Sequence, residues 1–250
     1  MTVSPVRVEL SVDTPDGALA ADSLGADRIE LCSAGALGGL TPGPGLLATV
    51  LAGVRTAEVH VLIRPREGGF RYTATEASAM VADVAHAVAA GARGVVVGAL
   101  DAGGDLDVPV LRDLVAAAQG REVTFHRALD VCRDPVAALD RLAELGFARV
   151  LSSGQAVRAE DGAGVVRELA RVAAGRLAVM ACGGIRPPNA IAVLRDTGVR
   201  DLHAAPRATV LGEAGSTVDF GGHGELDVAA ARELLAVVRA AGEMAHCPHG

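Results

Sequence analysis

The sequence contains no lysine, and all 23 of its basic residues are arginine. This absence excludes several kinds of chemistry. A Schiff-base aldolase and a pyridoxal-phosphate enzyme each need a lysine amine, and a Walker-type phosphate-binding loop needs its own lysine. No lysine-linked cofactor is therefore possible, and we expect any bound anion to be held by arginine side chains or by backbone N–H groups.

Aromatic residues are also scarce, with no tryptophan and one tyrosine, and the net charge is −7. These features argue against nucleic acid or an anionic membrane surface as a partner. The N-terminal stretch Met1–Arg7 lacks the charged start and apolar core of a secretory signal, and the longest uncharged run, Leu31–Val54, is broken by glycines and prolines. We predict a cytosolic protein without a membrane span.

Short β-branched runs alternate with longer Ala- and Leu-rich stretches along the whole chain, which is typical of a parallel sheet covered by helices. Eight strand–helix units in 250 residues predict one TIM-type (β/α)8 barrel domain spanning residues 1–250. A doubly wound sheet is the alternative, but Ser11–Pro15 stands where a glycine-rich dinucleotide fingerprint would follow the first strand. The glycine-rich stretch Leu211–Gly224 is predicted to be a long loop that could cover one end of the barrel.

The predicted strands are Val6–Val12, Arg28–Cys32, Val59–Arg64, Gly94–Leu100, Val123–Arg127, Arg149–Ser152, Leu177–Ala181 and Asp201–Ala204. The predicted helices are Pro15–Leu24, Gly45–Val54, Ala74–Ala90, Val108–Ala118, Pro135–Leu145, Ala163–Ala174, Asn189–Asp196 and Leu226–Ala241.

The first two predicted strands carry similar polar residues near their C-terminal ends. Period-two alternation places Glu9 on the same strand face as Ser11, and Glu30 on the same face as Cys32. If that face is the barrel lumen, both carboxylates are buried and need partners, for which Arg64 and His126 are candidates. A structural ion network that fixes barrel packing is an equally good interpretation of these residues.

Other polar residues follow the remaining strands, at the end of the barrel where the chemistry of such folds is located. Planar guanidinium groups suit phosphate or carboxylate, and the glycines after the seventh strand would let backbone N–H groups approach an anion. The pattern therefore predicts a pocket for a small anionic metabolite, although a structural histidine and a plain tight turn explain some of it equally well. Its candidate residues are Arg64, Arg66, His126, Arg127, Asp130, Ser152, Gly183, Gly184 and His203, together with Glu9 and Glu30.

Four cysteines without CxxC spacing are expected to be free thiols in a reducing compartment. Cys32 is the thiol best placed for a soft metal such as Cu(I), because it ends a strand beside a glutamate, although a buried inert cysteine is the commoner finding. The tail residues His246, Cys247 and His249 also look metal-like, but they follow the last predicted helix and are expected to fray.

Several motifs together resemble the copper homeostasis protein CutC family. These motifs are Gly25–Cys32, Gly38–Pro42, Ile63–Arg66, Val123–Ala128 and Arg149–Gly154. The resemblance implies a TIM-barrel-like cytoplasmic protein, a homodimer or higher homo-oligomer, associated with copper tolerance and in some members with Cu(I) binding. Members proposed to bind copper carry a cysteine near the end of the first strand, where this sequence has Ser11, so Cys32 would need another second ligand.

Three functional hypotheses follow. The resemblance implies copper homeostasis with Cys32 as a copper ligand. The residues at the strand ends favour an enzyme or binding protein for a phosphorylated or carboxylated metabolite, in which arginines hold the anion and Glu30 or His126 moves protons. The third hypothesis is a non-catalytic scaffold with a merely structural polar lumen.

Overall fold

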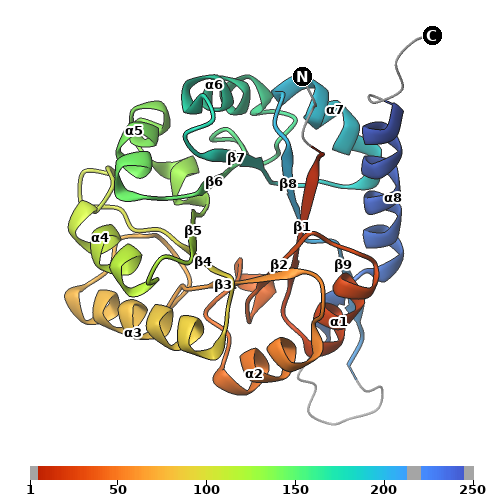
Figure 1. The fold of residues 1–250 in the computed structure, drawn as a ribbon, viewed down its shortest axis with the longest axis horizontal. Helices are drawn as coiled ribbons and strands as arrows, with labels where there is room; N and C mark the ends of the chain where they lie inside the picture. Colours follow the sequence, from red (N-terminus) through yellow and green to blue (C-terminus); the bar gives the residue numbers. More distant parts are fainter. Residues whose placement is uncertain (1–4, 213–220, 245–250) are drawn as a thin grey trace.

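A computed structural model describes residues 5–212 and 221–244 of the chain. Eight parallel strands close into a barrel in the order β1 to β8, with β1 paired to both β2 and β8 (Figure 1). Helices surround this ring on the outside (Figure 1). The structure thus confirms the predicted TIM-type barrel.

The barrel strands are β1 (Arg7–Val12), β2 (Arg28–Leu31), β3 (Glu58–Leu62), β4 (Gly94–Val97), β5 (Glu122–Phe125), β6 (Arg149–Ser152), β7 (Ala178–Ala181) and β8 (Asp201–Ala204). The α-helices are α1 (Pro15–Ser23), α2 (Pro44–Gly53), α3 (Ala74–Ala90), α4 (Val108–Ala117), α5 (Pro135–Leu145), α6 (Ala163–Ala173), α7 (Pro187–Thr197) and α8 (Val228–Met244). Two 3₁₀ helices, η1 (Gly35–Leu37) and η2 (Arg127–Val131), follow β2 and β5. None of the described helices is both long enough and apolar enough to cross a membrane.

Helix ends follow local capping chemistry. The Thr73 hydroxyl accepts a hydrogen bond from the backbone N–H of Glu76, whose carboxylate accepts one from the backbone N–H of Thr73, so the two residues form a capping box at the start of α3. Asp134 accepts a hydrogen bond from the first turn of α5 in the same way. Gly91 ends α3 with a left-handed backbone, which glycine adopts without steric cost. These signals explain why both ends of α3 match their predicted positions.

The segment after β8 differs from the prediction. Arg207–Val210 forms β9, and His223–Leu226 forms β10, which pairs antiparallel to it. Leu226 was expected to begin the last helix, but it pairs with Arg207 in this hairpin instead. Asp227 then accepts a hydrogen bond from the backbone N–H of Ala230, and α8 starts two residues later than predicted. The rest of the predicted Leu211–Gly224 loop lies largely outside the described residues, as does the His246–His249 tail.

Alternation along the barrel strands separates an apolar outer face from a polar inner one. Val8, Leu10 and Val12 of β1 are fully buried beneath the helices, with at most 2% exposure. Glu9 lies between them on the other face, paired in register with Arg28 of β2 and with His203 of β8. The lumen therefore holds charged and polar side chains together with two small apolar clusters, whereas the main hydrophobic core lies between the strands and the helices. The two clusters are Cys32, Leu62 and Val96, and Leu151, Met180 and Cys182.

Candidate functional site

A pocket of about 260 Å³ opens at the C-terminal ends of the barrel strands, and we call it the mouth pocket. It lies where enzymes of this fold place their chemistry. Its walls come from Ser11, Glu30, Cys32, Gly35, Gly38, Gly39, Arg127, Cys182, Gly183, Gly184, Ile185, Arg186, His203, Ala205 and Arg207. A larger hollow of about 430 Å³ lies at the opposite end, between α7, α8 and the residues before β1, and its walls are mainly apolar. We place the candidate site in the mouth pocket because polar groups converge there.

Three titratable side chains meet at the base of the mouth pocket. The Nδ1 atom of His203 lies 2.7 Å from the Glu9 carboxylate, which is fully buried. The other ring nitrogen, Nε2, lies 3.9 Å from the carboxylate of Glu30. Among the described residues, these three are also a group whose ligand atoms lie close enough together to hold a metal ion. Glu9 thus fixes the ring of His203 so that Nε2 is directed toward Glu30.

The charges of this group depend on one another. Burial alone would lower the pKa of His203, but the nearby Glu30 and Glu9 carboxylates outweigh burial and raise it above its ordinary value. Burial and the charge of Glu9 raise the pKa of Glu30, although His203 opposes this shift. Burial would also raise the pKa of Glu9, but the hydrogen bond and charge of His203, with Arg28, hold it well below its usual range. Glu9 is therefore an anion, and its charge raises the pKa values of both Glu30 and His203.

Three arginines from separate elements line the mouth pocket. Arg127 belongs to η2, Arg186 lies just before α7, and Arg207 begins β9. The guanidinium of Arg127 is held by Asp130, which accepts a hydrogen bond of 2.8 Å from Nε. Asp13 accepts one of 2.7 Å from Nη1 of Arg207. Both carboxylates hold their arginines in fixed positions without lining the pocket themselves.

Asp13 connects two further parts of the rim. Its second carboxylate oxygen accepts a hydrogen bond of 3.0 Å from the backbone N–H of Gly35 in η1. A Cβ atom at Gly35 would overlap the guanidinium of Arg207, so only glycine leaves room for this arginine. The end of β1, the loop after β2 and the β9–β10 hairpin are therefore joined through one aspartate.

The glycines after β7 present backbone N–H groups at the same rim. Gly183 and Gly184 both have left-handed backbones and line the mouth pocket. No described residue accepts a hydrogen bond from the N–H of either glycine. A Cβ atom at Gly183 would lie 2.9 Å from Cβ of Ser153 and 3.0 Å from the carbonyl oxygen of Val157. The close approach of the β6–α6 loop thus requires glycine there, and the two N–H groups remain available for an anion.

Asp130 and Ser152 belong to a cluster of hydrogen-bonded polar groups behind the pocket. The hydroxyl groups of Ser152 and Ser153 donate hydrogen bonds of 2.7 and 2.8 Å to Asp130. The backbone N–H of Ser153 donates to the same carboxylate, at 3.0 Å. Neither Asp130 nor Ser152 lines the pocket. Both were predicted to bind ligand, but the structure places them where they position Arg127.

Arg64 and Arg66 do not line the mouth pocket. The guanidinium of Arg64 donates hydrogen bonds of 2.8 to 3.0 Å to backbone carbonyls of Leu37, Gly39 and Gly68, so it ties two loops together. The guanidinium of Arg66 pairs with Glu76, and the side chain of Arg66 is 40% exposed. The expectation that Arg64 is a partner of the buried glutamates is therefore wrong.

His126 is likewise not a partner of the buried carboxylates. Its Nδ1 accepts a hydrogen bond of 3.1 Å from the backbone N–H of Ala128, and its ring lies against Phe70 with ring centroids 4.7 Å apart. Burial, helped by the charge of Arg64, lowers the pKa of His126 to about 3. His126 is thus a neutral packing residue outside the pocket lining, and His203 occupies the place expected for it.

Cys32 lies at the pocket wall but is only 1% exposed. Burial, followed by the charge of Glu30, raises the pKa of its thiol to about 12. Its Sγ atom lies 3.8 Å from the hydroxyl oxygen of Ser11, which is a poor ligand for Cu(I). Cys182 lines the same pocket and is the other described thiol there. The surroundings of Cys32 alone therefore fit a soft metal poorly.

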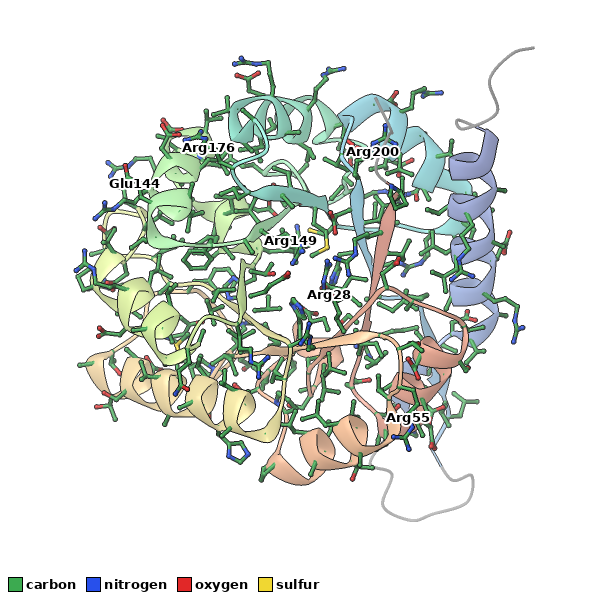
Figure 2. The ribbon with its side chains drawn as sticks, viewed as in Figure 1. Arg28, Arg55, Glu144, Arg149, Arg176 and Arg200 are labelled. Atoms are coloured by element: carbon green, nitrogen blue, oxygen red, sulfur yellow. The ribbon has the colours of Figure 1, made fainter. Side chains whose placement is uncertain are left out.

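A second charged group fills the N-terminal end of the lumen, and we call it the floor layer. Arg28 and Arg149 point into the ring of strands, whereas Arg55, Glu144 and Arg176 lie among the helices on the outside (Figure 2). The floor layer consists of Arg28, Glu58, His60, Glu122, Arg149 and Asp201. Arg28 lies 3.3 Å from Asp201 and 3.4 Å from Glu9, so the floor layer and the mouth pocket share Glu9.

Sequence reasoning missed Arg28, Arg186 and Arg207. Arg28 precedes Glu30 by two residues on a strand, so the same alternation that selected Glu30 would have selected it. Arg186 lies two residues after the predicted glycine pair, and this proximity was the available signal. Arg207 belongs to a hairpin whose two strands lie on either side of a long glycine-rich connection, so no local pattern marked it.

Comparisons with known proteins agree with one another. Residues 6–208 match the model of the CutC family. A CutC family protein of Caulobacter vibrioides is 46% identical over 205 residues, covering 82% of this chain and 83% of its own. One from Bacteroides thetaiotaomicron is 38% identical over 224 residues, covering 88% of this chain and 90% of its own. A solved CutC structure from Streptococcus agalactiae, to which a role in copper homeostasis is ascribed, superposes with a TM-score of 0.75 at 29% identity, covering 79% of this chain and 97% of that one. The chain belongs to the CutC family.

Proposed function

We propose that the mouth pocket binds a small metabolite that carries a phosphate or carboxylate group. The observation behind this proposal is the convergence of Arg127, Arg186 and Arg207 with the backbone N–H groups of Gly183 and Gly184. Guanidinium and backbone N–H groups that point at one position bind anions through short, charge-assisted hydrogen bonds.

The charge of the residues around the mouth pocket supports the proposal, although the net charge of the whole chain is negative. The net charge of the chain is −7, yet three arginines and one carboxylate line the mouth pocket. A site with fixed guanidinium groups loses little conformational entropy when the ligand arrives, because Asp13 and Asp130 already hold Arg207 and Arg127. The pocket volume of about 260 Å³ suits a small metabolite.

Titration calorimetry with inorganic phosphate and with small sugar phosphates tests this proposal. Arg186→Ala removes one guanidinium from the rim, and we expect it to weaken binding about tenfold or more, because a charge-assisted hydrogen bond is lost. Arg195→Ala is the matched control, since Arg195 pairs with its neighbour Asp196 on the exposed side of the same helix. Equal affinities of the wild type and Arg186→Ala, or no binding at all, would contradict the proposal.

A second candidate is Cu(I) binding within cytosolic copper homeostasis. The name of the Streptococcus agalactiae structure favours it, and Cys32 and Cys182 both line the mouth pocket. Thiolates are good ligands for Cu(I), whereas the Ser11 hydroxyl beside Cys32 is not. In this proposal copper is the cargo of a homo-oligomeric protein, and both buried thiols must lose their protons when the ion arrives.

Titration of the reduced protein with Cu(I) against a competing chelator tests the second candidate. If copper is bound between the two thiols, one ion binds per chain, and both Cys32→Ser and Cys182→Ser abolish binding. Cys132→Ser is the control, because Cys132 does not line the pocket. Weak binding that is unchanged in all three variants would rule the candidate out.

A further inference from the structure

We propose that Glu30 and His203 transfer protons at a carbon next to a carbonyl group in a small phosphorylated hydroxy-aldehyde or hydroxy-ketone. The inference rests on the proposed anion binding and names the reaction that the same pocket would carry out. Both residues line the mouth pocket together with the anion-binding arginines, so a bound ligand would contact all of them at once.

The geometry gives each residue one task. Glu9 holds Nδ1 of His203 at 2.7 Å, so only Nε2 of His203 faces the ligand. Glu30 is about nine-tenths buried, and its nearest described ion-pair partner is this Nε2, at 3.9 Å. Such a separation is too long for a hydrogen bond, so neither group satisfies the other. A ligand lying over the pair can accept a proton from one residue and lose a proton to the other.

The charged groups around Glu30 and His203 favour His203 as the proton donor and Glu30 as the base. Two carboxylates, Glu9 from β1 and Glu30 from β2, lie beside the His203 ring and favour its protonated form, from which Nε2 can donate to a carbonyl oxygen. Glu30 is buried beside the Glu9 carboxylate, and both features favour uptake of a proton by Glu30. Arg28, fully buried beneath Glu9, stabilises the Glu9 anion that the arrangement needs.

The reaction balances without any further reactant. The Glu30 carboxylate removes the proton from the carbon that bears the hydroxyl group, and the C–H electron pair forms a double bond to the carbonyl carbon. The carbonyl π electrons move to oxygen, which takes the proton from Nε2 of His203. The resulting enediol then gives its other hydroxyl proton to Nε2 and receives the proton of Glu30 at the former carbonyl carbon. The product is the isomeric carbonyl compound, and both residues return to their starting protonation states.

The composition of the chain restricts the alternatives for this step. Many barrel enzymes activate such a carbon through a lysine Schiff base, which this lysine-free chain cannot form. Direct proton transfer needs only a base, an acid and a fixed carbonyl, and the two titratable residues and the arginine rim would supply these.

Proton exchange with solvent provides the test. The wild-type protein is incubated in deuterium oxide with dihydroxyacetone phosphate or ribulose monophosphate, and proton NMR follows loss of the signal of the exchanging C–H. We expect catalysed exchange that falls about 100-fold or more in Glu30→Gln and in His203→Gln. Calorimetry should show that Glu30→Gln still binds the same sugar phosphates, because the arginines remain. Glu122→Gln is the matched control and keeps the wild-type rate, since Glu122 is half exposed at the other end of the lumen.

The outcomes separate this inference from the proposed function. Binding of the sugar phosphates without exchange would overturn the proton-transfer inference alone. Absence of binding to phosphate and to both sugar phosphates would overturn the proposed function as well. Exchange at the wild-type rate in folded Glu30→Gln and His203→Gln would assign the activity to a contaminant and overturn the inference.

Discussion

The two ends of the barrel lumen use buried charge differently. In the floor layer, Arg28 lies among three carboxylates, those of Glu9, Glu58 and Asp201, at 3.3 to 3.8 Å. At the mouth, Glu30 has one ion-pair partner among the described residues, at 3.9 Å, and both face a pocket. The same strand alternation therefore places arginines among several carboxylates at one end, and a carboxylate and an imidazole that face a pocket at the other. This difference fits the general rule that the C-terminal ends of such strands serve chemistry and the N-terminal ends serve stability.

We thus assign the structural interpretation of the polar side chains to the floor layer, and the proposed function to the mouth pocket. Glu9 belongs to both, since it contacts Arg28 below and His203 above. If the two ends differ in this way, substitutions in the floor layer should reduce the stability of the fold, and substitutions at the mouth should weaken ligand binding. Four predictions test it, from the largest expected effect to the smallest.

Arg28→Met should be the most damaging of the substitutions considered. Arg28 is fully buried, and its loss leaves Glu9 and Asp201 without their shared cation. Removing one partner of a buried ion pair costs about 3–5 kcal/mol. Urea unfolding of Arg28→Met measures this loss, with Arg176→Met as an exposed control. Equal midpoints for the two variants would show that the floor layer does not stabilise the fold.

His60 in the floor layer and His203 at the mouth should give opposite pH dependences of stability. Burial lowers the pKa of His60 to about 4 in the folded chain, whereas in the unfolded chain it is ~6.5. Below pH ~6.5 the unfolded chain therefore binds a proton that the folded chain does not bind, and stability falls as the pH is lowered from ~6.5 toward about 4. The pKa of His203 is raised on folding, so His203 affects stability in the opposite direction. Its contribution to the free energy of unfolding is complete below pH ~6.5 and is lost as the pH rises through the pKa of the folded state. Urea midpoints measured across pH should show a weaker acid slope in His60→Gln and a weaker alkaline slope in His203→Gln. Slopes unchanged from wild type would contradict the assignment.

Replacing each of the two rim glycines, Gly183 and Gly184, by alanine should reduce stability by different amounts. Both have left-handed backbones, but a Cβ at Gly183 meets atoms at 2.9 and 3.0 Å, whereas the nearest atom to a Cβ at Gly184 is 3.6 Å away on the flexible Arg158. Gly183→Ala should therefore cost about 2 kcal/mol or more, and Gly184→Ala about 1 kcal/mol. Thermal unfolding of both variants tests this order, and the reverse order would contradict the described loop contact.

Arg66→Ala should have the smallest effect. Arg66 lies outside the mouth pocket, and its loss removes an ion pair with Glu76 and hydrogen bonds to backbone carbonyls of its own loop, none of which lines the pocket. We expect phosphate affinity within twofold of the wild type, as measured by calorimetry. A tenfold loss would return Arg66 to the ligand-binding residues predicted from the sequence.

The fold was predictable because its signals are local and repeated. Helix α3 shows this best, since the capping box at Thr73 and the glycine at Gly91 mark both ends in the sequence itself. The β9–β10 hairpin was not predictable, because its pairing joins residues on either side of a long glycine-rich connection. Leu226 was assigned to a helix for this reason, although tertiary pairing makes it a strand residue.

The candidate site was predictable only in part. Alternation identified Glu9 and Glu30 as inward-facing, and the strand-end rule identified His203, Gly183 and Gly184. Which residues pair across the lumen could not be read from the sequence, because pairing depends on barrel closure. His126 follows β5 and His203 lies near the end of β8, yet the ring of His126 accepts a hydrogen bond from the backbone N–H of Ala128, whereas that of His203 reaches Glu9.

Barrel closure also determines when the mouth can form during synthesis of the chain. Glu9 is joined to His203, and Asp13 to Arg207, across 194 residues in each case. The first strand therefore leaves the ribosome long before the residues that complete its contacts. A nascent chain that ends before β8 contains Glu9 but not its partner His203. Such a chain also lacks Arg207, so the rim of the mouth pocket is incomplete. The mouth pocket is thus among the last features to form, and the ligand binding proposed for it would report that the whole barrel has closed.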